Sequence, residues 1–104
     1  MSYTMTEVYV KEDGTVDKGT GVDRVEHPAT GVYNVFADTS MPEDKLFFEL
    51  KPRVSSGLSY VVTRAEPSYL FDGTVIGAQI KFFKDFDTGQ PVDCAFELEI
   101  QVQS

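Results

Sequence analysis

The sequence predicts an all-β protein, an antiparallel β-sandwich of jelly-roll or immunoglobulin-like type with six to eight short strands. Three observations support this class. Apolar and polar residues alternate with a period of two along several segments. Gly, Pro and Asp residues separate those segments at roughly even spacing. Finally, no stretch of ten or more residues combines a 3.6-residue period with a capping signal, and a single helical turn fits only at 41–45.

The clearest expected strand is the segment 94–103. It alternates strictly, so one face should pack on a core and the other should meet water. Its apolar face consists of Cys94, Phe96, Leu98, Ile100 and Val102. Segments 46–51 and 74–83 repeat the pattern, with Leu46, Phe48, Leu50, Ile76, Ala78, Ile80 and Phe82 expected inward. Shorter strands are expected at 6–10 and 31–37, and a less regular one at 58–65.

Turn residues divide these strands. Asp13-Gly14, Asp72-Gly73 and Thr88-Gly89 are dipeptides that tolerate the backbone angles of tight turns. The prolines fall near expected strand ends, where a missing N–H costs no ladder hydrogen bond. The glycines at 14, 19, 21 and 31 should let the chain reverse twice and form three strands from its first third.

Composition limits the possible classes of function. The 104 residues predict one domain, 1–104, with a short N-terminal arm at 1–6. The formal charge of −8 repels phosphate backbones, and the basic pairs Lys51/Arg53 and Lys81/Lys84 are isolated among acids, so we expect no nucleic-acid partner. No apolar run reaches the roughly 20 residues of a membrane helix, so no membrane contact is expected. One cysteine excludes an internal disulfide framework, which is typical of a reducing compartment.

The sequence offers little catalytic chemistry. His27 is the only histidine, and Cys94 would have to meet it as a thiol–imidazole pair to act as a nucleophile. Cys94 shares the apolar face of its strand, so we expect a buried and inert thiol, no enzyme activity and no cofactor. We also expect no metal site, although Asp85, Asp87 and Asp93 have spacing that resembles part of a calcium loop. Whether these three residues bind calcium is left open.

The turn chemistry supplies a resemblance. Residues 13–25 read DGTVDKGTGVDRV, residues 30–35 read TGVYNV, and residues 88–98 read TGQPVDCAFEL. This pattern resembles a β-sandwich module that recurs in phage virion proteins and phage-derived bacterial proteins. The resemblance implies a virion structural role of the decoration or fibre type, and it carries no catalytic residues with it.

We therefore expect a non-enzymatic capsid decoration or accessory protein, made in the host cytoplasm and attached to the virion exterior. Its expected partners are other virion proteins and further copies of itself, with a trimer favoured. Two alternatives stay open at this point. One is a fibre-type module that binds a host glycan or receptor, and the other is a small regulator that binds one protein.

The expected interface combines the arm 1–6 with an apolar turn. Tyr69, Leu70 and Phe71 precede Asp72-Gly73, and a monomer would not favour leaving three such side chains in water. The predicted interface residues are therefore Tyr3, Tyr69, Leu70 and Phe71, placed on the arm and on a loop at 66–73.

Overall fold

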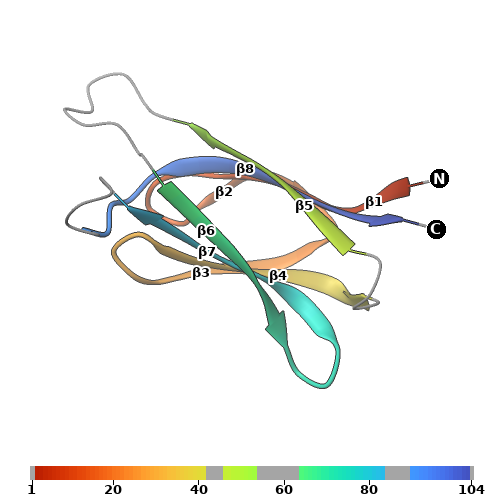
Figure 1. Ribbon diagram of the computed structural model, residues 1–104. Coiled ribbons are helices and arrows are strands. Elements are labelled where there is room, and N and C mark those ends of the chain that lie inside the picture. Colours follow the sequence, from red (N-terminus) through yellow and green to blue (C-terminus); the bar gives the residue numbers. More distant parts are fainter. Residues whose placement is uncertain (1, 42–45, 54–63, 84–89, 104) are drawn as a thin grey trace.

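Two antiparallel sheets of four strands pack against each other (Figure 1). The computed structural model describes residues 2–41, 46–53, 64–83 and 90–103. Sheet A has the strand order β2-β1-β8-β5 and sheet B the order β3-β4-β7-β6. The strands are β1 Ser2–Val10, β2 Val16–Thr20, β3 Val22–Ala29, β4 Val32–Met41, β5 Leu46–Arg53, β6 Arg64–Phe71, β7 Val75–Phe83 and β8 Ala95–Gln103. The predicted all-β sandwich is confirmed.

The core lies between the two sheets, where the inward faces of the central strands meet. The alternation predicted for 94–103 is confirmed, because Phe96, Leu98 and Ile100 are each at most 1% exposed. They belong to one core cluster with Tyr33, Val35, Ile80 and Phe82 of sheet B and with Val8, the neighbour of Leu98 in sheet A. The rings of Tyr33, Phe82 and Phe96 meet edge to face or tilted, with centroids 5.2–5.8 Å apart. Among the described residues no helix is long and apolar enough to cross a membrane.

Two glycines fix how the first strands are connected. Gly21 lies where the chain passes from β2 in sheet A to β3 in sheet B, with φ of +71°. A Cβ there would lie 2.0 Å from the carbonyl oxygen of Met5, so only glycine fits. The buried Thr6 hydroxyl donates to the Gly21 carbonyl at 3.1 Å and anchors this crossing to β1. Gly31, with φ of +74°, ends the β3–β4 turn against the backbone of Phe82 and Val92.

The prolines within strands all lie at sheet edges. Pro28 is in β3, Pro52 in β5 and Pro67 in β6, and each of these strands is the outermost of its sheet. An edge strand can lack an N–H on its open side without losing a ladder bond. Pro67 even lies in mid-strand, which the edge position permits.

One predicted face is wrong at a single residue. Ala78, Ile80 and Phe82 are buried as expected, but Ile76 is only half-buried, and Val75 takes the inward position instead. The register of β7 shifts there, because Leu70 pairs with Gly77 while Phe71 pairs with Val75. Ile76 is therefore the extra residue of a β-bulge, which shifts the period-two alternation by one residue.

Two further expectations need correction. Residues 2–6 do not form an arm, because β1 pairs with β8 from Ser2 opposite Gln103 onward. Residues 66–71 do not form a loop, because β6 pairs with β7 along its whole length up to Phe71. The expected strand at 58–65 lies mostly outside the described residues, as do the expected helical turn after Met41 and the Thr88-Gly89 turn.

Candidate functional site

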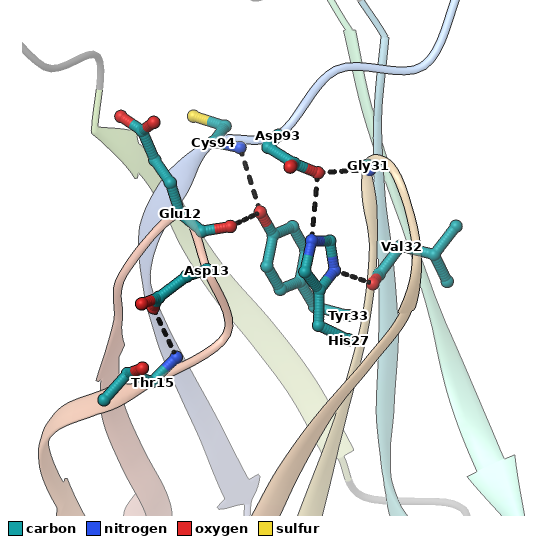
Figure 2. A network of polar contacts seen from close by, with 9 residues as sticks. All are labelled: Glu12, Asp13, Thr15, His27, Gly31, Val32, Tyr33, Asp93 and Cys94. Atoms are coloured by element: carbon teal, nitrogen blue, oxygen red, sulfur yellow. Dashed lines mark hydrogen bonds and ion pairs between the residues drawn. The ribbon is translucent and has the colours of Figure 1, made fainter.

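A cluster of polar side chains closes one end of the sandwich (Figure 2). Three segments that are distant in sequence meet there, namely the β1–β2 turn, the β3–β4 turn and the entry to β8. Tyr33 and His27 form its centre, and Asp93 lies beside them.

Tyr33 joins two of these segments through its hydroxyl group. The hydroxyl donates to the carbonyl oxygen of Glu12 at 2.5 Å, and it accepts a hydrogen bond from the backbone N–H of Cys94 at 3.1 Å. The side chain is fully buried, and this burial raises the pKa of the phenol well above its ordinary value. Tyr33 therefore stays neutral and acts as a fixed donor and acceptor for the main chain.

His27 joins the β3–β4 turn to the entry of β8. Its Nδ1 lies 2.8 Å from the carbonyl oxygen of Val32, and its Nε2 lies 3.1 Å from Oδ1 of Asp93. The imidazole stacks on the Tyr33 ring with centroids 4.3 Å apart and planes within 2° of parallel. The same Asp93 oxygen accepts the backbone N–H of Gly31 at 2.7 Å. Both ring nitrogens thus lie against oxygen atoms within the fold.

This arrangement suits a structural clamp better than a catalytic centre. A histidine that acts as a general base must offer one nitrogen to a nucleophile or to substrate. Both nitrogens of His27 already face oxygen atoms, and Figure 2 shows the Cys94 sulfur pointing away from the ring. The thiol lies 3.1 Å from the carbonyl oxygen of Ala95, and burial raises its pKa. The structure therefore does not form the thiol–imidazole pair that the sequence left to be considered.

Asp93 is engaged by Gly31 and His27, while Asp85 and Asp87 lie outside the described residues. Within the described part of the chain, no three His, Cys, Asp or Glu side chains are grouped so that they could hold a metal ion.

The outward side chains of sheet A form a second polar surface, arranged in rows across the strands. Glu7, Glu99 and Glu49 lie directly opposite one another on β1, β8 and β5. Such neighbouring like charges are unfavourable in a sheet. The central carboxylate, Glu99, is stabilised by two donors, the Thr4 hydroxyl and the Gln101 amide, each at 2.6 Å.

The next row along the strands carries a linked group of three residues. Arg53 donates through Nε to Oε2 of Glu97 at 2.7 Å and through Nη2 to the same oxygen. Hydrogen bonds from Tyr9 and Arg53 lower the pKa of Glu97, and the bond to Glu97 raises the pKa of Tyr9. The Arg53 guanidinium carbon and the Lys18 amine lie 5.7 and 5.8 Å from the Tyr9 ring centroid.

A hollow of about 340 Å³ opens beside this group. Its lining includes Tyr9, Lys11, Asp17, Arg53 and the small side chain of Ala95. Because Ala95 faces outward between longer side chains of the neighbouring strands, it leaves space above the sheet. The hollow combines an aromatic ring with charges of both signs.

The outer face of sheet B carries an apolar patch, which we define as Phe36 and Leu70. Both pair with Gly77, which lies between them and has no side chain. The Arg24 guanidinium carbon lies 4.0 Å from the Phe36 ring centroid and covers one side of the patch. Ser68, Asn34 and Gln79 form the next outward row, so the patch has a polar border.

The structure divides the predicted interface residues between two faces. Leu70 lies on the outer face of sheet B and is half-buried. Tyr69 points the other way and packs against the core, stacked on Phe48 with centroids 4.5 Å apart. Tyr3 and Phe71 lie within β1 and β6, and only their backbone pairing is described. The four residues therefore do not form one apolar loop.

Sequence reasoning missed the polar cluster and the rows of sheet A. Tyr33 and Asp93 both lie in the motifs quoted above, but nothing local signals that they meet through His27. The rows were closer to prediction, because the outward positions of 94–103 and 46–51 are rich in Glu, Lys and Arg. The rows themselves depend on the pairing register of the strands, which these segments alone do not determine.

Comparison with protein-family models found no match, and comparison with curated proteins and with solved structures found none either.

Proposed function

We propose that this chain is a non-enzymatic structural protein of a phage virion, attached to the particle exterior as a capsid decoration or accessory protein. The virion assignment comes from the resemblance of the turn motifs at 13–25, 30–35 and 88–98. The observation that carries attachment by protein contacts is the apolar patch of Phe36 and Leu70 on the outer face of sheet B.

The patch has the composition of a protein-binding surface. An apolar centre with a polar border is typical of protein–protein interfaces, and arginine and aromatic residues are enriched in them. Here Arg24 lies over Phe36, while Asn34 and Gln79 bond to each other in the bordering row at 2.9 Å. The polar cluster at the end of the sandwich supports the non-enzymatic part, because its His27 and Tyr33 hold main-chain groups together.

The experiment is a sedimentation assay of the purified chain with assembled capsids, with tails and with host cells in parallel. Wild-type chain should sediment with particles and should stay bound in moderate salt, because an apolar contact is little screened. Leu70→Ser should reduce loading strongly while the melting temperature changes little. Ser68→Ala, two residues along the same strand, is the matched control and should load normally. Equal loading of both variants would remove the patch as the attachment surface.

A second candidate, a fibre-type module that reads a host glycan, is favoured by the hollow beside Tyr9. An aromatic ring next to Asp17 and Arg53 can stack on a sugar and bond its hydroxyl groups. Binding to cells but not to particles, together with competition by free sugar, would support this candidate over decoration. The trimer expected from the sequence stays a prediction, and it is the alternative to the twofold pair proposed below.

A further inference from the structure

The outer face of sheet A is charged unevenly along its strands. One row consists of Thr20 and the three carboxylates Glu7, Glu99 and Glu49. The next row, two residues further along, contains Lys18, Tyr9, Glu97 and Lys51. Beyond it lie Arg53, Ala95 and Lys11, with the hollow above Ala95. On the other side of the carboxylates lies a row of Thr4, Gln101 and Phe47.

This concentration of cations is unusual for the chain as a whole. Four of the nine basic residues, Lys11, Lys18, Lys51 and Arg53, lie within two adjacent rows of one face of an acidic protein. They lie next to the row that carries Glu7, Glu99 and Glu49. Along the edge strand β5, where Glu49 and Lys51 are two residues apart, the face is therefore complementary to itself when one copy is turned around.

A twofold axis can lie between two such faces, parallel to both and perpendicular to the strands. Rotation about this axis reverses the order of the rows in the second copy. When the axis passes between the carboxylate row and the lysine row, Glu49 of one copy faces Lys51 of the other, and the reverse contact forms by symmetry. On the other strands, Glu7 then faces Tyr9, Lys18 faces Thr20, and Glu99 faces Glu97, whose charge Arg53 of its own chain already pairs. The outermost rows also exchange, so Phe47 faces Arg53 beside the hollow. Moving the axis by half a row spacing, onto the lysine row, would instead place Lys51 against Lys51.

The exposure of Phe47 fits this arrangement. It is one of two large apolar side chains among the described residues that are strongly exposed, at 38%, the other being Val16. Arginine attracts an aromatic face, and the hollow of about 340 Å³ next to Arg53 has room for a ring. A second copy would thus cover an apolar side chain that the single chain leaves in water.

The area is sufficient for a weak, specific pair. Four strands at a spacing of roughly 4.8 Å and a paired length of about eight residues at roughly 3.3 Å give a face of about 500 Å². Two such faces bury about 1,000 Å², which is at the lower limit for a specific interface. We therefore propose that the outer face of sheet A binds a second copy of this chain about a twofold axis, with Glu49 paired to Lys51 of the other copy.

Reversing one charge at a time tests this pairing directly. Glu49→Lys places two lysines opposite two lysines, and Lys51→Glu places two glutamates opposite two glutamates, so each variant alone should dimerise at least roughly tenfold more weakly than wild type. A mixture of the two variants should form heterodimers, because each lysine then faces a glutamate. The double variant Glu49→Lys/Lys51→Glu should recover dimerisation.

Both substitutions should leave the fold intact. The two side chains are 52% and 65% exposed, and their own contact within the chain is loose at 3.9 Å. Sedimentation equilibrium of each variant and of the mixture gives the association constants, and circular dichroism confirms that each variant is folded. Association should also weaken as salt is raised, because the contacts are ionic.

Phe47 provides an independent variant with a matched control. Phe47→Ser should weaken dimerisation, while Val16→Ser removes an equally exposed side chain from β2 and should not. A monomer at every concentration, a trimer, or single reversals that associate as well as wild type would each overturn the proposal. The assay needs only the purified chain, so its failure is separate from a failure to bind virions.

Discussion

The Tyr33 hydroxyl offers the sharpest test of the polar cluster. Tyr33→Phe keeps the ring, its burial and its stacking on His27, but removes the oxygen that bonds Glu12 and Cys94. The Cys94 N–H is buried, and a buried donor without a partner costs about 1–3 kcal/mol. The Glu12 carbonyl is only partly buried, and water can replace part of that bond. We expect a loss of about 2–3 kcal/mol in the free energy of unfolding.

Urea denaturation followed by circular dichroism measures this loss, since the chain has no tryptophan for fluorescence. With an m-value of about 1–1.5 kcal/mol/M, the midpoint should fall by roughly 1.3–3 M. Tyr9→Phe is the control, because Tyr9 bonds Glu97 on the outer surface and its removal should move the midpoint much less. Amide exchange at Cys94 should also accelerate in Tyr33→Phe. A midpoint within roughly 0.3 M of wild type would refute the clamp.

Three further outcomes follow from packing and ionisation. Leu98→Ala should lower the free energy of unfolding by about 2–5 kcal/mol in urea denaturation, whereas Glu99→Ala on the opposite face should change it by no more than about 0.5 kcal/mol. Equal effects of the two substitutions would contradict the register of β8. The free energy of unfolding should fall as pH rises from about 8.5 through 10, because burial raises the pKa of Cys94 and Tyr33 in the folded state and the unfolded chain loses those protons first. Tyr33→Phe should reduce this fall. A pH-independent urea midpoint over that range would contradict the prediction. Tyr69→Ser should lower the melting temperature, because Tyr69 is stacked on Phe48 against the core, and an unchanged temperature would restore the exposed-loop prediction.

Local alternation predicted the fold class well where strands are regular. The face of 94–103 was predictable because β8 runs without interruption between two partners. β7 was predicted less well because a bulge at Ile76 has no mark in the apolar pattern. β6 was missed as a strand because Pro67 and Asp72-Gly73 suggest a loop, and only its edge position makes the proline acceptable.

The polar cluster could not be predicted, because its contacts span most of the chain. Gly31 and Asp93 are 62 residues apart, and Cys94 and Tyr33 are 61 apart. Such contacts depend on how the two sheets are paired, which short-range periodicity does not determine. The same limit explains why Tyr69 and Leu70, adjacent in sequence, were grouped as one surface although they lie on opposite faces of sheet B.

Protein mass spectrometry of purified particles tests the proposed virion role most directly. The proposed role implies a phage that encodes the chain; its particles would be purified by density gradient, and the copy number of the chain would be measured relative to the major capsid protein. A virion structural role predicts a constant ratio across preparations, with the chain removed by denaturant but retained through salt washes. Absence of the chain from purified particles, while it is abundant in the infected-cell lysate, would contradict the proposed function.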